Sequence, residues 1–123
     1  MKQIIIVEDD LILSLLLEKQ VTRMGYHVAA KVNSGEEAVE QIRKILPDLV
    51  LMDIKLIGVM DGVEAIEQIR GFTDVPVLYL TGNSDESTRK RARATNPVAY
   101  MVKPVDMTLF KRTIRNILEK SYT

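Results

Sequence analysis

The sequence predicts an α/β fold, a doubly wound sheet of five parallel strands flanked by five helices. Short apolar runs alternate with longer segments of helical periodicity along the whole chain. Such strict alternation predicts parallel strands joined by crossover helices that cover both faces of the sheet. The central runs are continuous in Val, Ile and Leu, which is typical of strands that are buried on both faces.

The predicted elements follow from this alternation in chain order. The strands are QIIIV (3–7), HVAAKV (27–32), LVLM (49–52), VPVLYL (75–80) and AYMV (99–102). The helical segments are 11–24, 35–46, 62–70, 85–95 and 107–121. Residues that cap helix N-termini precede four of these segments, namely Asp10, Ser34, Asp61 and Asp106. Ser34 and Asp61 are each followed three residues later by glutamate, the spacing of a capping box, and Gly25 is placed to end the first helix.

Length and composition indicate one compact domain and exclude several classes of protein. The 123 residues suit a single domain covering 1–123, and 46% hydrophobic residues are enough for a sizeable core. Lys plus Arg and Asp plus Glu both number 17, so no overall charge favours nucleic acid or an anionic membrane. There is no cysteine, which excludes disulfides and thiolate chemistry, and no apolar run long enough for a membrane span. We expect a soluble, cytoplasmic protein.

Polar residues follow four of the predicted strands at the point where each strand ends. Glu8 and Asp9 follow the first strand, Asp53 the third, Thr81 the fourth and Lys103 the fifth. In a parallel sheet, ligands bind outside the carboxyl ends of the strands, where the strand order switches. We therefore expect these side chains to form one site, assembled from four separate segments.

This combination of side chains suits phosphoryl transfer. Three carboxylates at one edge of a sheet repel one another unless a cation lies among them, and Mg²⁺ prefers carboxylates, waters and phosphate oxygens. Lys103 can pair with Asp53 at rest and with a phosphoryl oxygen later, and Thr81 supplies a hydroxyl donor. An aspartate with these neighbours is equipped to attack phosphorus, because phosphoryl transfer needs mainly positioning and charge neutralisation.

Each of these features has an ordinary structural explanation when it is taken alone. A pair of carboxylates after a strand often caps a helix. A single aspartate at a strand end is more often a loop residue than a nucleophile, and Lys-Pro is usually a turn. What favours a site is that all four segments end at the same edge, which the fold by itself does not require.

In this order and spacing, the motifs resemble those of a response regulator receiver domain, the phospho-accepting module of two-component signalling. IIIVEDD is similar to its first strand and acid pair, LVLMDI to its phosphorylation strand, VLYLTG to its fourth strand with the switch hydroxyl, and AYMVKP to its fifth strand and lysine. The resemblance covers the whole chain. It implies a flavodoxin-like sheet, as in chemotaxis regulators, with strand order 2-1-3-4-5.

The resemblance also implies a role for each acidic residue of the site. Asp53 would be phosphorylated by a histidine kinase or a phosphotransfer protein. Mg²⁺, or Mn²⁺ in its place, would be bound directly by Asp9 and Asp53 and through water by Glu8, and the main-chain carbonyl of Lys55 would be a further ligand. Such a domain hydrolyses its own phosphoaspartate but turns over no independent substrate, so it is not an enzyme in the usual sense.

The same resemblance implies how the phosphorylated state is signalled. Thr81 would bond the phosphoryl group, Lys103 would pair with it, and the Lys103–Pro104 peptide would be cis, which only an X–Pro bond allows cheaply. Tyr100 falls at the aromatic switch position, which turns inward when the threonine moves toward the phosphate. The change would be presented on the face of the fourth helix, fifth strand and fifth helix. The alternative for Tyr100 is an ordinary half-buried strand tyrosine.

The loop after Asp53 departs from the family pattern. The proline that is common four residues after the phospho-acceptor is Ile57 here, and the Asp-Gly pair comes one residue later, which predicts a longer loop. Lys55 and Asn83 lie two residues past the acceptor and the switch threonine, where they could obstruct the hydrolytic water. We therefore expect the phosphoaspartate to persist for minutes or longer. The alternative is a solvent-facing Lys55 without effect.

Helix 11–24 indicates a docking surface. The predicted buried stripe, at 3.6 residues per turn, consists of Leu13, Leu16, Leu17, Val21 and Met24. Leu11 and Leu15 then project from the opposite side, where they would contact the helical bundle of a phosphodonor; scattered surface leucines are the alternative. The basic run RKRAR at 89–93 is interpreted as a solvated face rather than an output or dimer contact, and no direct binding to nucleic acid is expected.

Three rival functions fit the residues less well. A haloacid-dehalogenase-like phosphatase needs a second aspartate two positions past the nucleophile, where this chain has Lys55. A flavin carrier needs a phosphate loop after the first strand, but EDD would repel the FMN phosphate. A binding-only pseudo-receiver is disfavoured by the complete set of site residues. The kinase, stimulus, output partner and a phosphorylation-dependent dimer stay open, as does whether the chain is a stand-alone receiver or part of a longer regulator.

Overall fold

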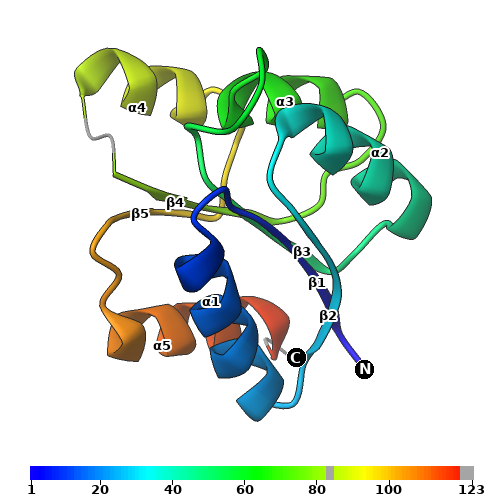
Figure 1. Cartoon of the computed structure of the whole chain (residues 1–123), viewed down its shortest axis with the longest axis vertical. Coiled ribbons are helices and arrows are strands. Elements are labelled where there is room, and N and C mark those ends of the chain that lie inside the picture. Colours follow the sequence, from blue (N-terminus) through cyan, green and yellow to red (C-terminus); the bar gives the residue numbers. More distant parts are fainter. Residues whose placement is uncertain (83–84, 120–123) are drawn as a thin grey trace.

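The computed structural model describes residues 1–82 and 85–119, and within them strands and helices alternate throughout (Figure 1). The strands are β1 (Gln3–Val7), β2 (His27–Val32), β3 (Leu49–Met52), β4 (Val77–Thr81) and β5 (Ala99–Val102). The helices are α1 (Leu11–Arg23), α2 (Gly35–Ile45), α3 (Gly62–Ile69), α4 (Glu86–Arg93) and α5 (Met107–Leu118). The predicted α/β class is confirmed. No helix in the described part is long and apolar enough to cross a membrane.

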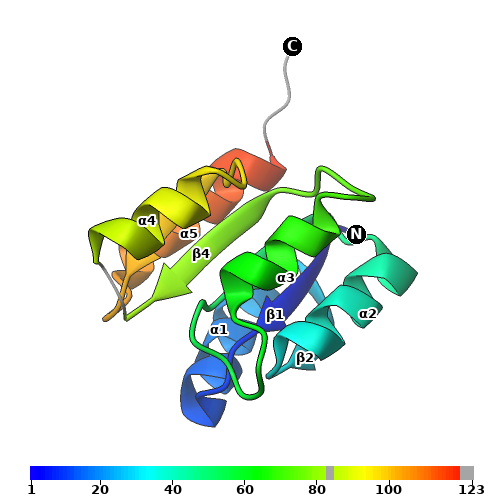
Figure 2. The ribbon, with the colours of Figure 1, turned by 90° about the horizontal axis from the view of Figure 1, so that it is seen from above.

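The strands form one parallel sheet in the order β2-β1-β3-β4-β5, which confirms the order that the resemblance implied. Helices α1 and α5 cover one face of the sheet, and α2, α3 and α4 cover the other (Figure 1). Seen from above, α4 and α5 lie toward one side of the sheet and α2 and β2 toward the other (Figure 2). Because the strands are parallel, their carboxyl ends all lie at the same edge.

Alternating residues in the strands build one apolar core on each face of the sheet. Ile4 and Ile6 of β1 belong to the core under α1 and α5, whereas Ile5 and Val7 belong to the core under α2 and α3. Strands β3 and β4 are buried at every position, as their continuous apolar runs predicted. Each such buried aliphatic side chain contributes about 2 kcal/mol, so the sheet is a firm platform for the residues that follow each strand.

The observed helix starts agree with the capping signals in the sequence. The carboxylates of Asp10, Asp61 and Asp106 and the hydroxyl of Ser34 each accept a hydrogen bond from a backbone N–H in the first turn. Asp85 also caps α4, so this helix starts one residue later than predicted. Strand β4 begins at Val77 rather than at residue 75, directly after Pro76, which has no N–H to donate to a sheet. Predicted residues 120–121 of the last helix lie outside the described residues.

The buried face of α1 differs from the predicted stripe in one residue. Leu17 and Val21 are buried as expected, but Leu16 is 41% exposed. Ser14, which the sequence analysis left out of the stripe, is buried in its place. The helix is rotated about its own axis so that residues 14, 17 and 21 face the sheet. Because successive residues are about 100° apart around the helix, position 16 then points away from the sheet. Expecting Leu16 to face inward was therefore wrong.

Candidate functional site

A cleft of about 670 Å³ lies at the carboxyl edge of the sheet. The ends of β1, β3, β4 and β5 all contribute to it, so four segments that are far apart in the sequence meet here. The lining residues are Asp9, Asp10, Asp53, Lys55, Thr81, Gly82, Asp85 and Lys103. The structure therefore gathers the strand-end residues that the sequence singled out, with Glu8 directly beside them.

Asp53 is held rigidly at the floor of this cleft. It follows the last residue of β3, and its N–H donates to the Val7 carbonyl at 2.9 Å, which ties it to β1. Its side chain is 5% exposed. The Oδ1 atom accepts a hydrogen bond from the Ile54 N–H at 2.8 Å, and Oδ2 lies 3.2 Å from Lys103 Nζ. The two oxygens are thus distinguished, since one is bonded to a backbone N–H and the other to the ammonium of a side chain.

Lys103 is shared between two buried carboxylates. Its Nζ lies 3.0 Å from Glu8 Oε1 and 3.2 Å from Asp53 Oδ2. Glu8 is 3% exposed and also accepts a hydrogen bond from the Asp10 N–H at 3.0 Å. The Lys103 backbone is fixed in turn, because its N–H donates to the Thr81 carbonyl at 2.8 Å. The Lys103–Pro104 peptide bond is cis, the isomer that the resemblance implied.

One ammonium does not balance the negative charge in this site. Burial raises the pKa of Glu8 to about 7, and the Asp53 charge adds to the rise, while the Asp10 N–H and Lys103 oppose it. Burial alone would lower the pKa of Lys103, but the hydrogen bond and charge of Glu8 and Asp53 outweigh it, so this pKa is raised. The site therefore stabilises added positive charge.

The donor set fits a magnesium ion. One carboxylate oxygen from each of Glu8, Asp9 and Asp53 lies within 4.8 Å of the others. Two of these residues are buried and Asp9 is exposed, so the group has protein on one side and the open cleft on the other. Hard cations with oxygen ligands suit such a set, and Mg²⁺ keeps several waters, which an open cleft permits.

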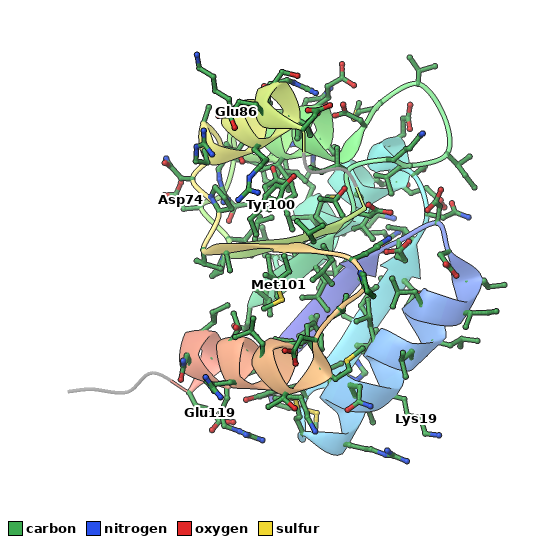
Figure 3. The ribbon with its side chains drawn as sticks, turned by 90° about the vertical axis from the view of Figure 1, so that its left-hand side faces the viewer. Lys19, Asp74, Glu86, Tyr100, Met101 and Glu119 are labelled. Atoms are coloured by element: carbon green, nitrogen blue, oxygen red, sulfur yellow. The ribbon has the colours of Figure 1, made fainter. Side chains whose placement is uncertain are left out.

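Thr81 and Tyr100 lie on neighbouring strands on the way from the cleft toward α4. Thr81 ends β4, is fully buried and lines the cleft. Tyr100 on β5 is half-buried, and Figure 3 shows its ring on the α4 side of the strand while Met101 points to the α5 side. The Tyr100 ring centroid is 6.0 Å from that of Tyr79, and the Arg89 guanidinium lies 5.1 Å from it. Tyr100 is therefore in contact with α4.

The remaining predicted residues lie around the cleft. Lys55 is exposed at its rim, whereas Asn83 lies outside the described residues. Leu11 and Leu15 are 74% and 54% exposed, so the predicted outward direction of both side chains is confirmed.

Sequence reasoning missed an apolar hollow of about 350 Å³ beside the cleft, between α1 and the segment that leads into α5. Its apolar lining consists of Ile12, Leu13, Leu16, Pro104, Val105 and Met107. The available signal was Ile12, which continues the exposed apolar side of α1 and is 81% exposed. Asp85 at the cleft was also missed; its only signal was its position before a helix.

The comparison with protein families identifies the class of this fold and site. The model of the response regulator receiver domain matches residues 4–115, and the chain belongs to this family. Among curated proteins, it is 32% identical over 121 residues to the transcriptional regulatory protein ZraR of Escherichia coli K12, covering 98% of this chain and 27% of ZraR. It is also 32% identical over 107 residues to PdtaR of Mycobacterium tuberculosis H37Rv, covering 87% of this chain and 52% of PdtaR.

Solved structures agree with this assignment. The signal receiver domain of a modulated diguanylate cyclase from Desulfovibrio desulfuricans is 33% identical with a TM-score of 0.88, covering 98% of this chain and 95% of that one. The receiver domain of sensor histidine kinase PA1611 from Pseudomonas aeruginosa, with magnesium coordinated in its active site cleft, is 27% identical with a TM-score of 0.85, covering 96% of this chain and 98% of that one.

Membership in the family defines the general role of the chain. Receiver domains are signalling modules of two-component systems, not classical enzymes, and they interact with histidine kinases or phosphotransfer proteins. The family binds Mg²⁺ in its active-site cleft, and this chain has an acidic cluster of Glu8, Asp9 and Asp53. The chain spans about a quarter to a half of the length of the curated relatives that it matches. Activities of those whole proteins are therefore not transferred to it.

Proposed function

We propose that residues 1–123 form one cytoplasmic receiver domain in which Asp53 accepts a phosphoryl group from the phosphohistidine of a kinase or phosphotransfer protein. The observation that carries this proposal is the Lys103 ammonium, which contacts buried Asp53 Oδ2 inside an open, acidic cleft. A carboxylate kept buried beside further carboxylates costs stability, and the fold has no need of it. A function that uses the carboxylate explains why it is there.

The geometry supports attack by Asp53 Oδ2. The Ile54 N–H holds Oδ1 at 2.8 Å, which fixes the carboxylate plane and leaves Oδ2 facing Lys103. Oδ2 forms the new bond to phosphorus, the bond from phosphorus to the histidine nitrogen breaks, and the electron pair of that bond leaves with the imidazole. Lys103 then moves from the carboxylate to a phosphoryl oxygen, and the Thr81 hydroxyl donates to another.

The acidic residues would hold the metal that this transfer requires. Asp9 and Asp53 are the proposed direct ligands, Glu8 acts through water, and the Lys55 carbonyl completes the protein's share. The bound Mg²⁺, or Mn²⁺, supplies neutralisation of the phosphoryl oxygens. Asp53 then signals through Thr81 and Tyr100, because a phosphoryl group that bonds Thr81 favours the arrangement in which both side chains are drawn inward. The face formed by α4, β5 and α5 presents this change to a partner, a linked domain or a second copy.

Acetyl phosphate with Mg²⁺ tests the phospho-acceptor directly. Wild type should gain the mass of one phosphoryl group, Asp53→Asn should gain none, and a chelator should abolish the reaction. Asp48→Asn is the matched control, because Asp48 precedes the opposite end of β3 and bonds the Gln3 N–H at 2.7 Å. A wild type that stays unmodified while magnesium binds would instead support a binding-only pseudo-receiver.

The exposed apolar side of α1 is the proposed docking site for the phosphodonor. Leu11, Leu15 and the hollow beside Ile12 lie next to the cleft, where a helical bundle must place its phosphohistidine. Leu15→Glu should slow transfer from the cognate kinase and spare phosphorylation by acetyl phosphate. The control is Leu46→Glu, since Leu46 is also exposed but follows α2. Equal losses with both donors would contradict docking.

Lys55 at the cleft rim, together with Asn83, is the proposed brake on dephosphorylation. The exposed ammonium lies two residues past Asp53, where it can exclude or misplace the attacking water. Lys55→Ala should shorten the lifetime of the phosphoaspartate, measured by its decay after the donor is removed. Lys44→Ala on α2 removes the same charge away from the cleft and should leave the lifetime unchanged. A decay that is unchanged or slower in Lys55→Ala would remove this role.

A further inference from the structure

One ion pair joins α4 to the start of α3. The Arg91 guanidinium forms a two-pronged pair with Asp61, with Nη1 3.1 Å from Oδ2 and Nη2 3.3 Å from Oδ1. The other α4 ion pair in the described part of the chain, between Arg93 and Glu86, stays within the helix. Arg91 is therefore placed to transmit a displacement of α4 to α3.

Asp61 cannot move independently of the first turn of α3. Its Oδ1 atom accepts the Glu64 N–H at 2.8 Å, and Glu64 Oε1 accepts the Asp61 N–H at 2.8 Å. This reciprocal capping box satisfies two backbone donors at once and makes the cap and the turn one unit. A displacement of the Asp61 carboxylate by Arg91 should therefore also displace the N-terminus of α3.

The next residue, Gly62, lies directly against the backbone of the phospho-acceptor. Its N–H donates to the Ile54 carbonyl at 2.7 Å. A Cβ atom at this position would lie only 2.0 Å from the Asp53 carbonyl oxygen, so only glycine allows the contact. The start of α3 is consequently in close contact with the backbone of Asp53, so a shift of one should displace the other.

We propose that Arg91 and Asp61 form a second mechanical connection between α4 and the phospho-acceptor, separate from Thr81 and Tyr100, and that it restrains phosphorylation. It runs from Arg91 through Asp61 and Gly62 to the Asp53 backbone. The pair exists together with the direct contact between Lys103 and the Asp53 carboxylate, a contact that phosphorylation must break. We assign the pair to the arrangement that precedes phosphorylation, so loosening it should favour the phosphorylated one. This inference rests on the proposed function of Asp53.

The route through Tyr100 and the route through Asp61 reach α4 at residues that are two positions apart. Arg89 lies over the Tyr100 ring, one route, and Arg91 binds Asp61, the other. A partner that binds α4 and displaces Arg91 from Asp61 should raise the affinity of Asp53 for a phosphoryl group. By thermodynamic linkage, phosphorylation should raise the affinity of that partner for α4 by the same factor. Both partners are partly exposed, and exposed pairs couple weakly, which limits the factor to about two- to fivefold.

A double-mutant cycle read out by beryllofluoride tests this connection. Beryllofluoride with Mg²⁺ serves as the phosphoryl analogue, and its affinity is measured by titration for wild type, Arg91→Gln, Asp61→Asn and the double variant. Asparagine retains the helix cap, so Asp61→Asn removes the charge without removing the start of α3. Arg93→Gln is the matched control, because it removes one α4 cation whose partner is in α4 itself.

Each single variant should bind beryllofluoride about two- to fivefold more tightly than wild type, and the double variant no more tightly than either. Arg93→Gln should bind like wild type. Unchanged or weaker binding in the single variants, additive effects, or an equal change in Arg93→Gln would overturn the connection, the last by showing a general effect of charge. Failure of wild type itself to bind the analogue would instead refute Asp53 as the phospho-acceptor, and this inference with it.

Discussion

The two ends of the sheet bury charged side chains in opposite ways. At the carboxyl end, the Lys103 ammonium is shared by Glu8 and Asp53. Carboxylates outnumber the lysines that line this cleft, so negative charge is in excess. At the amino end, the hydrogen bonds that Arg70, from the end of α3, makes within the described part of the chain all go to neutral carbonyl oxygens. They belong to Thr73, Val75, Thr95 and Asn96, in the segments that lead into β4 and β5.

Arg70 and Thr95 are the centres of a hydrogen-bond network at the amino end, and no buried side-chain nitrogen or oxygen in the described part of the chain lacks a partner. Arg70 donates from Nε to the Thr95 carbonyl at 2.9 Å and from Nη1 to the Val75 carbonyl at 2.7 Å. The Thr95 hydroxyl in turn donates to the Ala92 carbonyl at 2.6 Å and meets the Tyr79 hydroxyl at 2.8 Å. Such fully satisfied networks rigidify a structure, and this one anchors the C-terminal end of α4.

The difference between the ends separates structural from functional burial of charge. Where each polar group has its partner, as around Arg70, burial serves stability alone. Where carboxylates outnumber the cation, as around Lys103, stability is lost in exchange for a site that attracts a metal and a phosphoryl group. Natural proteins commonly give up stability at their functional sites in this way. Three substitutions test this difference between the two ends of the sheet.

The largest effect is expected from removing the amino-end network. Arg70→Met should lower the free energy of unfolding by about 2 kcal/mol, because several partly buried carbonyls lose their donor together. Urea denaturation measures the change, and acetyl phosphate should still modify the folded protein. Arg43→Met is the control. The Arg43 guanidinium lies 4.3 Å from the centre of the Phe72 ring, so this substitution leaves the carbonyl partners of Arg70 unchanged. An equally small loss in both variants would mean that water replaces the Arg70 bonds.

A smaller effect of opposite sign is expected at the carboxyl end. Asp53→Asn removes one of two carboxylates that share Lys103, so in metal-free buffer it should raise the free energy of unfolding by about 1 kcal/mol. Added Mg²⁺ should stabilise wild type more than the variant, because ligands stabilise the state that binds them. Thermal melts with and without chelator measure both changes. A destabilised Asp53→Asn would show that Lys103 needs this carboxylate more than Glu8 repels it.

A third effect, of about the same size at neutral pH, concerns the pH dependence of the amino end. Burial raises the pKa of Tyr79 to about 12 against an ordinary value of 10. The folded protein therefore keeps this proton where the unfolded chain loses it, and the stabilisation is full below pH 10 and lost as the pH rises from 10 to 12. Tyr79→Phe should lower the free energy of unfolding by about 1 kcal/mol at neutral pH, because the hydrogen bond to Thr95 is lost. Above pH 10, the free energy of unfolding of this variant should fall less steeply than that of wild type.

Denaturation curves across that pH range test the assignment to Tyr79. Tyr26→Phe is the comparison, because burial and the hydrogen bond that Tyr26 donates to Glu119 also raise the pKa of Tyr26 to about 12. The Tyr26→Phe substitution should reduce the slope of the free energy of unfolding against pH by a similar amount, while leaving the hydrogen bonds of Arg70 intact. If the free energy of unfolding of Tyr79→Phe falls as steeply above pH 10 as that of wild type, the proton of Tyr79 does not contribute to the alkaline loss of stability.

Local signals in the sequence were enough to predict the secondary-structure elements and the residues of the site. Short apolar runs, segments with a period of 3.6 residues and the capping residues are local signals, readable within a few positions, and they placed the strands and helices with errors of only one to a few residues at their ends. Because parallel strands end at one edge, the same reading also gathered Asp53, Thr81 and Lys103 without a structure.

Which charged residues contact one another could not be predicted in full, because contacts across long stretches of chain depend on how the helices and the sheet pack together. Lys103 reaches Glu8 across 95 positions, and Arg91 reaches Asp61 across 30. Neither distance leaves a periodic signal in the sequence. The exposure of Leu16 has the same origin, since the rotation of α1 on the sheet is set by packing against it. The local pattern thus fixed what each element is, and packing fixed which charges meet.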